Sequence, residues 1–155
     1  MIIDTLIIDR TQEDVDEWAR LRDLGTDGMT DEERAVWDAG MKGAYKASDF
    51  NRVSEAHNYL ADILRHYGAI SRYTELKTDW ETGDKPLAED LSNFLGAIRR
   101  LKSATNAGGD MPESFRGWTF QTANDLEQLL ININEKSKKI ETSLIFSGDN
   151  YAGEA

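Results

Sequence analysis

The sequence contains no cysteine and only two histidines among its 155 residues. A chain without cysteine forms no disulfide, no thiolate zinc site and no cysteine nucleophile, so its stability must come from packing. His57 and His66 are not four positions apart, as two metal ligands on one helical face would be. We expect His57, on an apolar stripe, to be a hydrogen-bonded core residue and His66 to face solvent. The sequence therefore predicts no metal site and no cofactor.

Long apolar runs are also missing. None approaches the roughly 18 residues of a membrane span, and the stretch from Met1 to Asp9 is too short and too acidic for a signal peptide. Basic residues are outnumbered by acidic ones: the chain has 18 lysines and arginines and 29 aspartates and glutamates, which gives a net charge of −11. Such a charge repels phosphate backbones and anionic lipids. We therefore expect a soluble chain that binds neither nucleic acid directly nor membranes.

The motifs of common enzymes are absent as well. The sequence has no glycine-rich phosphate loop and no Gly-x-Ser-x-Gly elbow. A possible calcium loop from Asp23 to Arg34 places Arg34 at the twelfth position, where a bidentate glutamate is required. The acids are densest in the first third of the chain, and we interpret them mainly as solvated helix faces. The sequence predicts no catalytic residues, and we expect that the protein is not an enzyme.

The most regular pattern lies near the C-terminus, between Trp118 and Phe146. Apolar residues recur there at steps of three, four or seven, which predicts a long amphipathic helix. Thr119 is the expected N-cap, and Asn124 and Glu127 are among the polar residues that lie largely off the stripe. The stripe consists of Phe120, Ala123, Leu126, Leu130, Ile133, Ile140 and Leu144. Residues 147–155 show no periodicity and contain two glycines, which predicts a flexible C-terminal tail.

Four further helices are predicted upstream. Thr11 and Thr30 are N-cap candidates for the first two, which end near Gly25 and near Gly40 or Gly43. The third runs from a cap at Ser48–Asp49 to Gly68, and the fourth follows Pro86. Residues 1–9 are expected to form an arm or short strand, 69–76 a connector more readily than a strand, and 103–115 a mobile loop.

Together these patterns predict one helical domain over residues 1–155. We expect an all-α bundle of four to five helices with little or no β-structure, whose third, fourth and last helices form the core. Trp18 and Trp37 follow helix stripes and are predicted to be core residues. Trp80 and Trp118 lie in or beside loops. With Phe146 and Tyr151 they are candidate interface residues, the alternative being that these rings cap the bundle ends.

Five local strings resemble those of small structural proteins from the tail regions of phages and prophages of Gram-positive bacteria, an uncharacterised family. The strings span nearly the whole chain, and their order and spacing resemble those of the family. They are Asp9-Arg-Thr-Gln-Glu-Asp-Val15, Asn51-Arg-Val53, Lys77-Thr-Asp-Trp80, Thr122-Ala-Asn-Asp-Leu-Glu-Gln128 and Phe146-Ser-Gly-x-x-Tyr-x-Gly-Glu154.

The resemblance implies a virion or tail-associated role and supplies no catalytic residues. We therefore expect a non-enzymatic virion component of the tail or baseplate. Its expected partners are other virion and tail proteins, with a homo-oligomer possible, and it would reside in the host cytoplasm during assembly and then in the virion. The alternative from another class is a small acidic inhibitor or DNA-mimic that binds a basic host partner.

Overall fold

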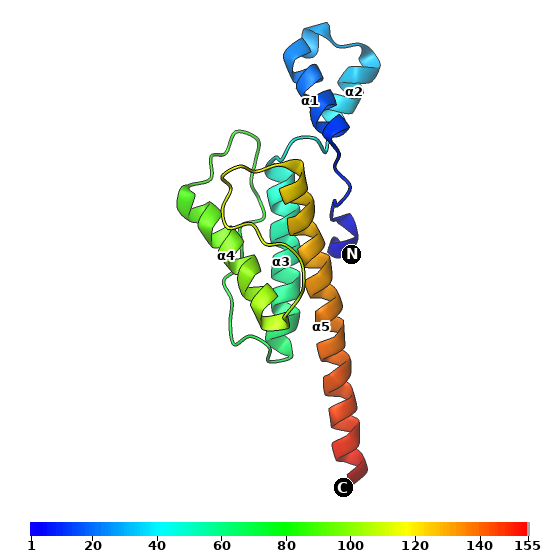
Figure 1. The fold of residues 1–155 in the computed structure, drawn as a ribbon, viewed down its shortest axis with the longest axis vertical. Helices are drawn as coiled ribbons and strands as arrows, with labels where there is room; N and C mark the ends of the chain where they lie inside the picture. The colour runs from blue at the N-terminus through cyan, green and yellow to red at the C-terminus, as the bar shows by residue number, and fades with distance from the viewer. Residues whose placement is uncertain (155) are drawn as a thin grey trace.

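The computed structural model describes the backbone of residues 1–154 and the side chains of residues 1–144. Its regular secondary structure is helical (Figure 1). None of the described residues forms a strand. The predicted all-α fold with a long C-terminal helix is confirmed. The helices are α1 (Gln12–Leu24), α2 (Asp31–Ala39), α3 (Ala47–His66), α4 (Ala88–Thr105) and α5 (Phe120–Glu154), with 3-10 turns η1 (Ile2–Thr5) and η2 (Thr26–Gly28).

Capping residues set most of the helix starts where the sequence predicts them. Thr30 and Glu33 form a reciprocal capping box, in which each side chain accepts a hydrogen bond from the backbone N–H of the other. Thr11 does the same with Asp14, and the Thr119 hydroxyl accepts from the N–H three residues on, at the start of α5. These local bonds satisfy N–H groups that lack a partner in the first turn.

The start of α3 differs from the prediction. Its N-cap is Lys46 instead of Ser48 or Asp49. Asp49 lies within the first turn, and its Oδ2 accepts a hydrogen bond from the Lys46 N–H at 2.8 Å. An aspartate can cap a helix itself, or it can lie three residues inside the helix and bind the backbone N–H of the cap residue. The sequence does not distinguish these two positions, so the predicted start is two to three residues too late.

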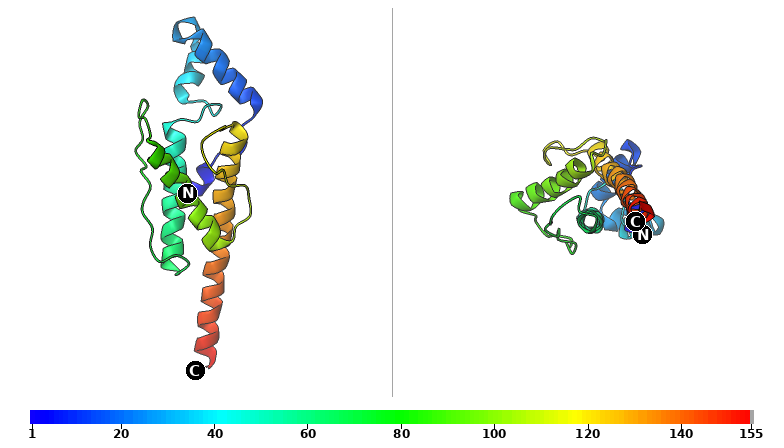
Figure 2. Two further views of the ribbon diagram at one scale, coloured as in Figure 1. Left: turned by 60° about the vertical axis from the view of Figure 1, so that its left-hand side comes forward. Right: turned by 90° about the horizontal axis from the view of Figure 1, so that it is seen from below.

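The core lies between α3, α4 and α5, as predicted. Each helix contributes buried apolar residues to one shared core cluster. The three helices lie side by side in the body (Figure 2). The fully buried large apolar residues of these three helices are Leu60 and Leu64 from α3, Leu95, Ile98 and Leu101 from α4, and Leu126, Leu129, Leu130 and Ile133 from α5.

Helices α1 and α2 form a hairpin that stands above this body (Figures 1 and 2). The prediction that Trp18 and Trp37 are core residues is wrong, because both remain partly exposed and neither belongs to the core cluster. Leu21 and Met29 are the buried apolar residues of the hairpin. Two short helices offer a tryptophan only a small surface to pack on, so helix periodicity identified the correct face but not its degree of burial.

The two ends of the chain also differ from expectation. Of the two alternatives for residues 1–9, an arm or a short strand, the strand is wrong: Ile2–Thr5 form a 3-10 turn, and Ile3 is buried against the core. Helix α5 continues to Glu154, through most of the segment 147–155 that the sequence predicts to be a tail. Gly148 and Gly153 each disfavour a helix by about 1 kcal/mol but do not forbid one. With 35 residues, α5 is about 52 Å long and extends past the body (Figure 1).

The base of the hairpin depends on one close approach. A Cβ atom at Gly43 would overlap the backbone carbonyl of Asp14 in the first turn of α1. We expect Gly43→Ala to lower the free energy of unfolding by about 1–3 kcal/mol, since either backbone must move to admit the methyl group. Gly108→Ala is the matched control, because a Cβ there meets no atom within 4 Å. Chemical denaturation of both variants checks this, and equal stabilities would contradict it.

Candidate functional site

Four charged side chains meet where the N-terminal segment crosses α3 and α5. Arg10 Nη2 donates to Asp49 Oδ1 at 3.1 Å and to Glu127 Oε1 at 2.7 Å. Arg52 Nη2 donates to the same two oxygens at 2.6 and 2.7 Å, and its Nε donates to Glu127 Oε2 at 3.1 Å. The side chains of Arg10, Asp49 and Glu127 are at most 2% exposed. We refer to these four residues as the buried charge cluster.

The same region holds the N-terminal segment in place. The side-chain amide of Asn124 accepts from the Arg10 N–H at 3.1 Å and donates to the Arg10 carbonyl at 2.9 Å. Glu127 also accepts a hydrogen bond from the backbone N–H of Ile7. One face of α5 therefore binds the backbone of a segment more than 100 positions earlier in the chain.

The buried charge cluster is balanced within itself. Two guanidinium groups face two carboxylates, and every carboxylate oxygen accepts at least one hydrogen bond. The cluster therefore joins three segments of the chain, namely the N-terminal segment, α3 and α5.

A second set of contacts fixes the segment 73–80, which runs without regular structure beside α3. Asn58 binds both backbone groups of Leu76, at 2.9 and 3.0 Å. Asn51 binds both backbone groups of Trp80, at 2.8 and 2.9 Å. The expected connector over 69–76 is therefore observed, and its backbone is paired with side-chain amides instead of with a partner strand.

A cleft of about 580 Å³ lies between this segment, α3 and α4. Its wall on α3 includes His57 and Ser54, each 1% exposed. His57 is buried and hydrogen-bonded as predicted, with Nδ1 2.9 Å from Asn58 Oδ1, and His66 is exposed as predicted. Burial lowers the pKa of His57, and the contact with Asn58 offsets part of that shift. The imidazole is therefore neutral at pH 7.

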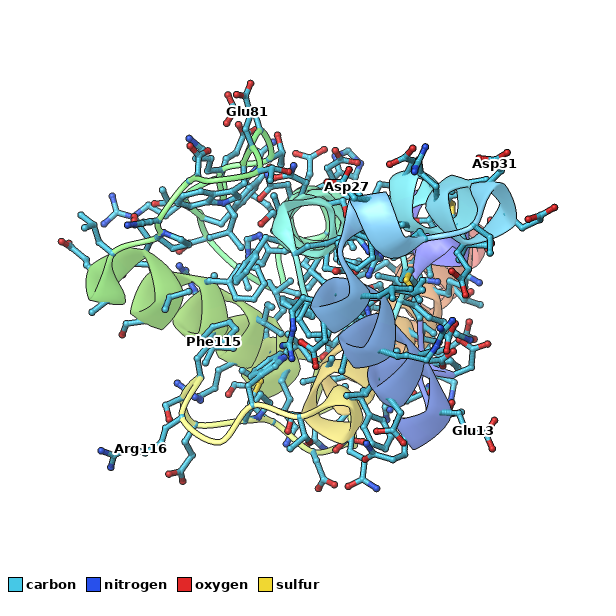
Figure 3. The ribbon with its side chains drawn as sticks, turned by 90° about the horizontal axis from the view of Figure 1, so that it is seen from above. Glu13, Asp27, Asp31, Glu81, Phe115 and Arg116 are labelled. Atoms are coloured by element: carbon cyan, nitrogen blue, oxygen red, sulfur yellow. The ribbon has the colours of Figure 1, made fainter. Side chains whose placement is uncertain are left out.

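The structure places two of the four candidate interface residues in one aromatic cluster. Trp118 stacks on Phe115 with ring centroids 4.3 Å apart. The ring centroid of Trp80 lies 6.5 Å from that of Phe50, and the Phe50 ring also contacts Phe115. Both tryptophans are partly buried. Phe115 points into the body, whereas Arg116 beside it points outward, as do Glu13, Asp31 and Glu81 (Figure 3). The side chains of Phe146 and Tyr151, the other two candidates, lie outside the described part of the structure.

Sequence reasoning did not identify the buried charge cluster. Its members nevertheless lie in or beside the strings that carry the resemblance. Arg10 belongs to the first string, Arg52 to the second and Glu127 to the fourth, while Asn51 of the second string binds Trp80 of the third. Four of the five strings, far apart in the chain, therefore contact one another. The helical pattern gave no signal for the cluster, because Glu127 lies largely off the apolar stripe.

No helix among the described residues is long and apolar enough to cross a membrane. The same residues contain no group of three or more potential metal ligands close enough to share an ion. Comparisons with models of protein families, with curated proteins and with solved structures give no match.

Removing one charge from the buried charge cluster should be costly. We expect Glu127→Gln to lower the free energy of unfolding by about 3–5 kcal/mol, because the two buried guanidinium groups of Arg10 and Arg52 then share a single carboxylate, that of Asp49. Glu135→Gln is the control on the same helix, since Glu135 forms an exposed pair with Lys138 and should matter little. Urea denaturation measures both, and a Glu127→Gln variant as stable as Glu135→Gln would refute this role.

The buried imidazole should make stability depend on pH. The unfolded chain takes up a proton near the ordinary histidine pKa of 6.5, whereas folded His57 does so only at lower pH. Below about pH 6.5 the unfolded state therefore binds more protons, and stability falls as pH falls. His57→Gln should flatten this slope relative to the unmodified chain, while His66→Gln should leave it intact. Unfolding free energies between pH 7.5 and 5 check this, and identical slopes for all three proteins would contradict it.

Proposed function

We propose that this chain is a non-enzymatic structural component of a phage virion, associated with the tail or baseplate, and that it acts through protein contacts. The resemblance of its five local strings to small tail-region proteins motivates the proposal. Helix α5 is the structural observation that carries it. This helix packs on the body as far as Ile140 and its backbone then continues, still helical, to Glu154.

A helix that extends past the rest of its domain is difficult to stabilise in an isolated protein. Helices are stabilised in water mainly by packing their apolar face, and the backbone of α5 extends past the body (Figure 1). Leu144, near the start of the projecting part, is 45% exposed. Such a segment gains its packing when it meets another protein, which is the expectation for a part of a larger particle.

The body is consistent with a role in contacts. The carboxylates of Asp49 and Glu127 in its interior are bound by arginines, whereas Glu81 on its surface points outward (Figure 3). Trp80 remains a candidate interface residue, because its ring is partly exposed and Lys77 Nζ lies 4.6 Å from the ring centroid. An aromatic ring beside a cation at a cleft edge gives a partner both apolar area and charge.

Particle composition tests the proposal. We expect virions purified from an induced host to contain this protein at a fixed ratio to the other tail proteins, measured by quantitative mass spectrometry. Trp80→Ala should reduce that ratio, whereas Trp37→Ala, which alters the hairpin instead, should not. Circular dichroism establishes that both variants are folded. Particles that lack the protein altogether would overturn the proposal.

The rival function, an acidic inhibitor of a basic host protein, makes the opposite prediction in the same experiment. The protein would then stay in the soluble lysate and bind a host partner in a manner that weakens steeply with salt. Apolar contacts within a particle persist at high salt. Washing the purified particles at low and high ionic strength therefore separates the two functions.

A further inference from the structure

The cleft of about 580 Å³ between α3, α4 and the segment 73–80 contains a histidine whose two ring nitrogens have different environments. His57 lies on the α3 wall and is 1% exposed. Its Nδ1 lies 2.9 Å from Asn58 Oδ1, whereas its Nε2 has no hydrogen-bond partner among the described residues. Nε2 is not fully buried either, unlike the unpartnered Ser54 Oγ one turn earlier. The small accessible part of His57 therefore includes Nε2, and it opens onto the cleft.

Asn58 determines which of the two nitrogens carries the proton. Its Oδ1 accepts a hydrogen bond from the Leu76 N–H at 2.9 Å, and its Nδ2 donates to the Leu76 carbonyl at 3.0 Å. A flipped amide would place donor against donor and acceptor against acceptor, so the orientation of the amide is fixed. The Asn58 oxygen can only accept, and His57 Nδ1 must therefore donate to it. Because the imidazole is neutral at pH 7, Nε2 has no proton and is a hydrogen-bond acceptor.

An unpartnered acceptor at this depth is unusual, because polar groups in protein interiors nearly all have partners. The backbone of Leu76 fixes Asn58, and Asn58 fixes the imidazole in one tautomer and one orientation. Binding sites use the same arrangement, in which a second residue binds one ring nitrogen and leaves the other for the ligand. The missing partner of His57 Nε2 is therefore a hydrogen-bond donor that enters the cleft from outside.

Aromatic rings line every side of the cleft. They are Phe50 from α3, Phe94 from α4, and Tyr73 and Trp80 from the connecting segment. The Tyr73 ring lies edge-on to the imidazole, with ring centroids 6.2 Å apart. Aromatic pairs attract one another beyond the area that they bury, preferably edge to face or offset. The volume also lies within the range of sites that hold small molecules. A lining of this kind favours a flat aromatic group.

The charges on the walls of the cleft balance one another. The charged lining residues are Glu75 and Lys77 from the connecting segment and Asp90 and Arg100 from α4. Two acids and two bases give no preference for an anion or a cation, and the neutral imidazole adds no charge. A neutral donor is therefore the partner that fits Nε2, because it brings no unpaired charge into the cleft.

We propose that this cleft binds a neutral aromatic hydroxyl group, whose O–H donates to His57 Nε2 while its ring lies among the aromatic side chains. A phenolic hydroxyl keeps its proton at pH 7, since its ordinary pKa is about 10. The hydroxyl belongs either to a small free phenol or to a tyrosine side chain of another polypeptide. This inference does not depend on the proposed virion role.

The small number of histidines makes a direct test possible, because His57 and His66 are the only two in the chain. The full-length protein is labelled with ¹⁵N-histidine, and His57→Phe assigns the ring signals. At pH 7 we expect the free protein to carry the His57 proton on Nδ1. Phenol should shift the Nε2 resonance of His57 toward its protonated position in a saturable way and leave the His66 signals unchanged. A proton on Nε2 in the free protein, or no saturable shift with phenol, would overturn the inference.

A pair of probes of equal size isolates the hydrogen bond. Phenol and toluene differ only in the exchange of a hydroxyl for a methyl group, and the amide signal of Gly96, which lines the cleft, reports the binding of both. The ratio of phenol affinity to toluene affinity should be at least about fivefold higher for the unmodified chain than for His57→Phe, which lacks the acceptor. His66→Phe is the matched control and should keep the ratio of the unmodified chain. Equal ratios for the unmodified chain and His57→Phe would contradict the inference.

Misfolding of the variant does not confound the result. In His57→Phe the Asn58 oxygen keeps the Leu76 N–H as its partner, so no buried acceptor is left unpaired, and circular dichroism checks the fold. The tautomer and the phenol-induced shift are measured on the unmodified chain and need no variant. Acetyl-Gly-Tyr-Gly-amide forms the second arm. Tighter binding of this peptide than of phenol identifies a tyrosine side chain as the ligand, and the reverse identifies a small phenol.

Discussion

The contact between Arg10 and the pair of carboxylates on α3 and α5 is the constraint on which the rest of the structure depends. Arg10 lies on the only stretch of chain that leads from the buried turn η1 to the hairpin, so its position determines where α1 begins. Buried ion pairs often add little net stability, because desolvation offsets their attraction. Their geometric demand is strict, however, and here it fixes the register between a segment without regular structure and two helices.

The helices themselves could be predicted from the sequence because their causes are local. The apolar stripe from Phe94 to Leu101 needs only the period of the helix to be recognised. The box formed by Thr30 and Glu33 needs only a spacing of three. Both signals lie within one or two turns of chain. The helix ends were less predictable where a single acid, Asp49, could act at more than one position of the first turn.

The site could not be predicted in the same way. Asn124 and Glu127 are polar and lie largely off the apolar stripe, which is the pattern of a solvent-facing surface. Both instead bind the N-terminal segment, and Glu127 is completely buried. Helical periodicity shows that one face of a helix is apolar and the other polar. It does not show whether a distant segment of the chain covers the polar face. The partial exposure of Trp18 was not predicted either, because a helical period does not give the degree of burial.

The paired amides of Asn51 and Asn58 place an unusual limit on the sequence between Leu76 and Trp80. The two asparagines lie two helical turns apart, about 10 Å along α3, and the extended chain between their backbone partners covers a similar distance. The side-chain amides form hydrogen bonds only with backbone groups of this stretch, so these bonds do not depend on which side chains it carries. The residues between Leu76 and Trp80 can therefore change over evolutionary time without loss of these hydrogen bonds. An insertion or deletion of one residue would, however, move one backbone partner away from its asparagine.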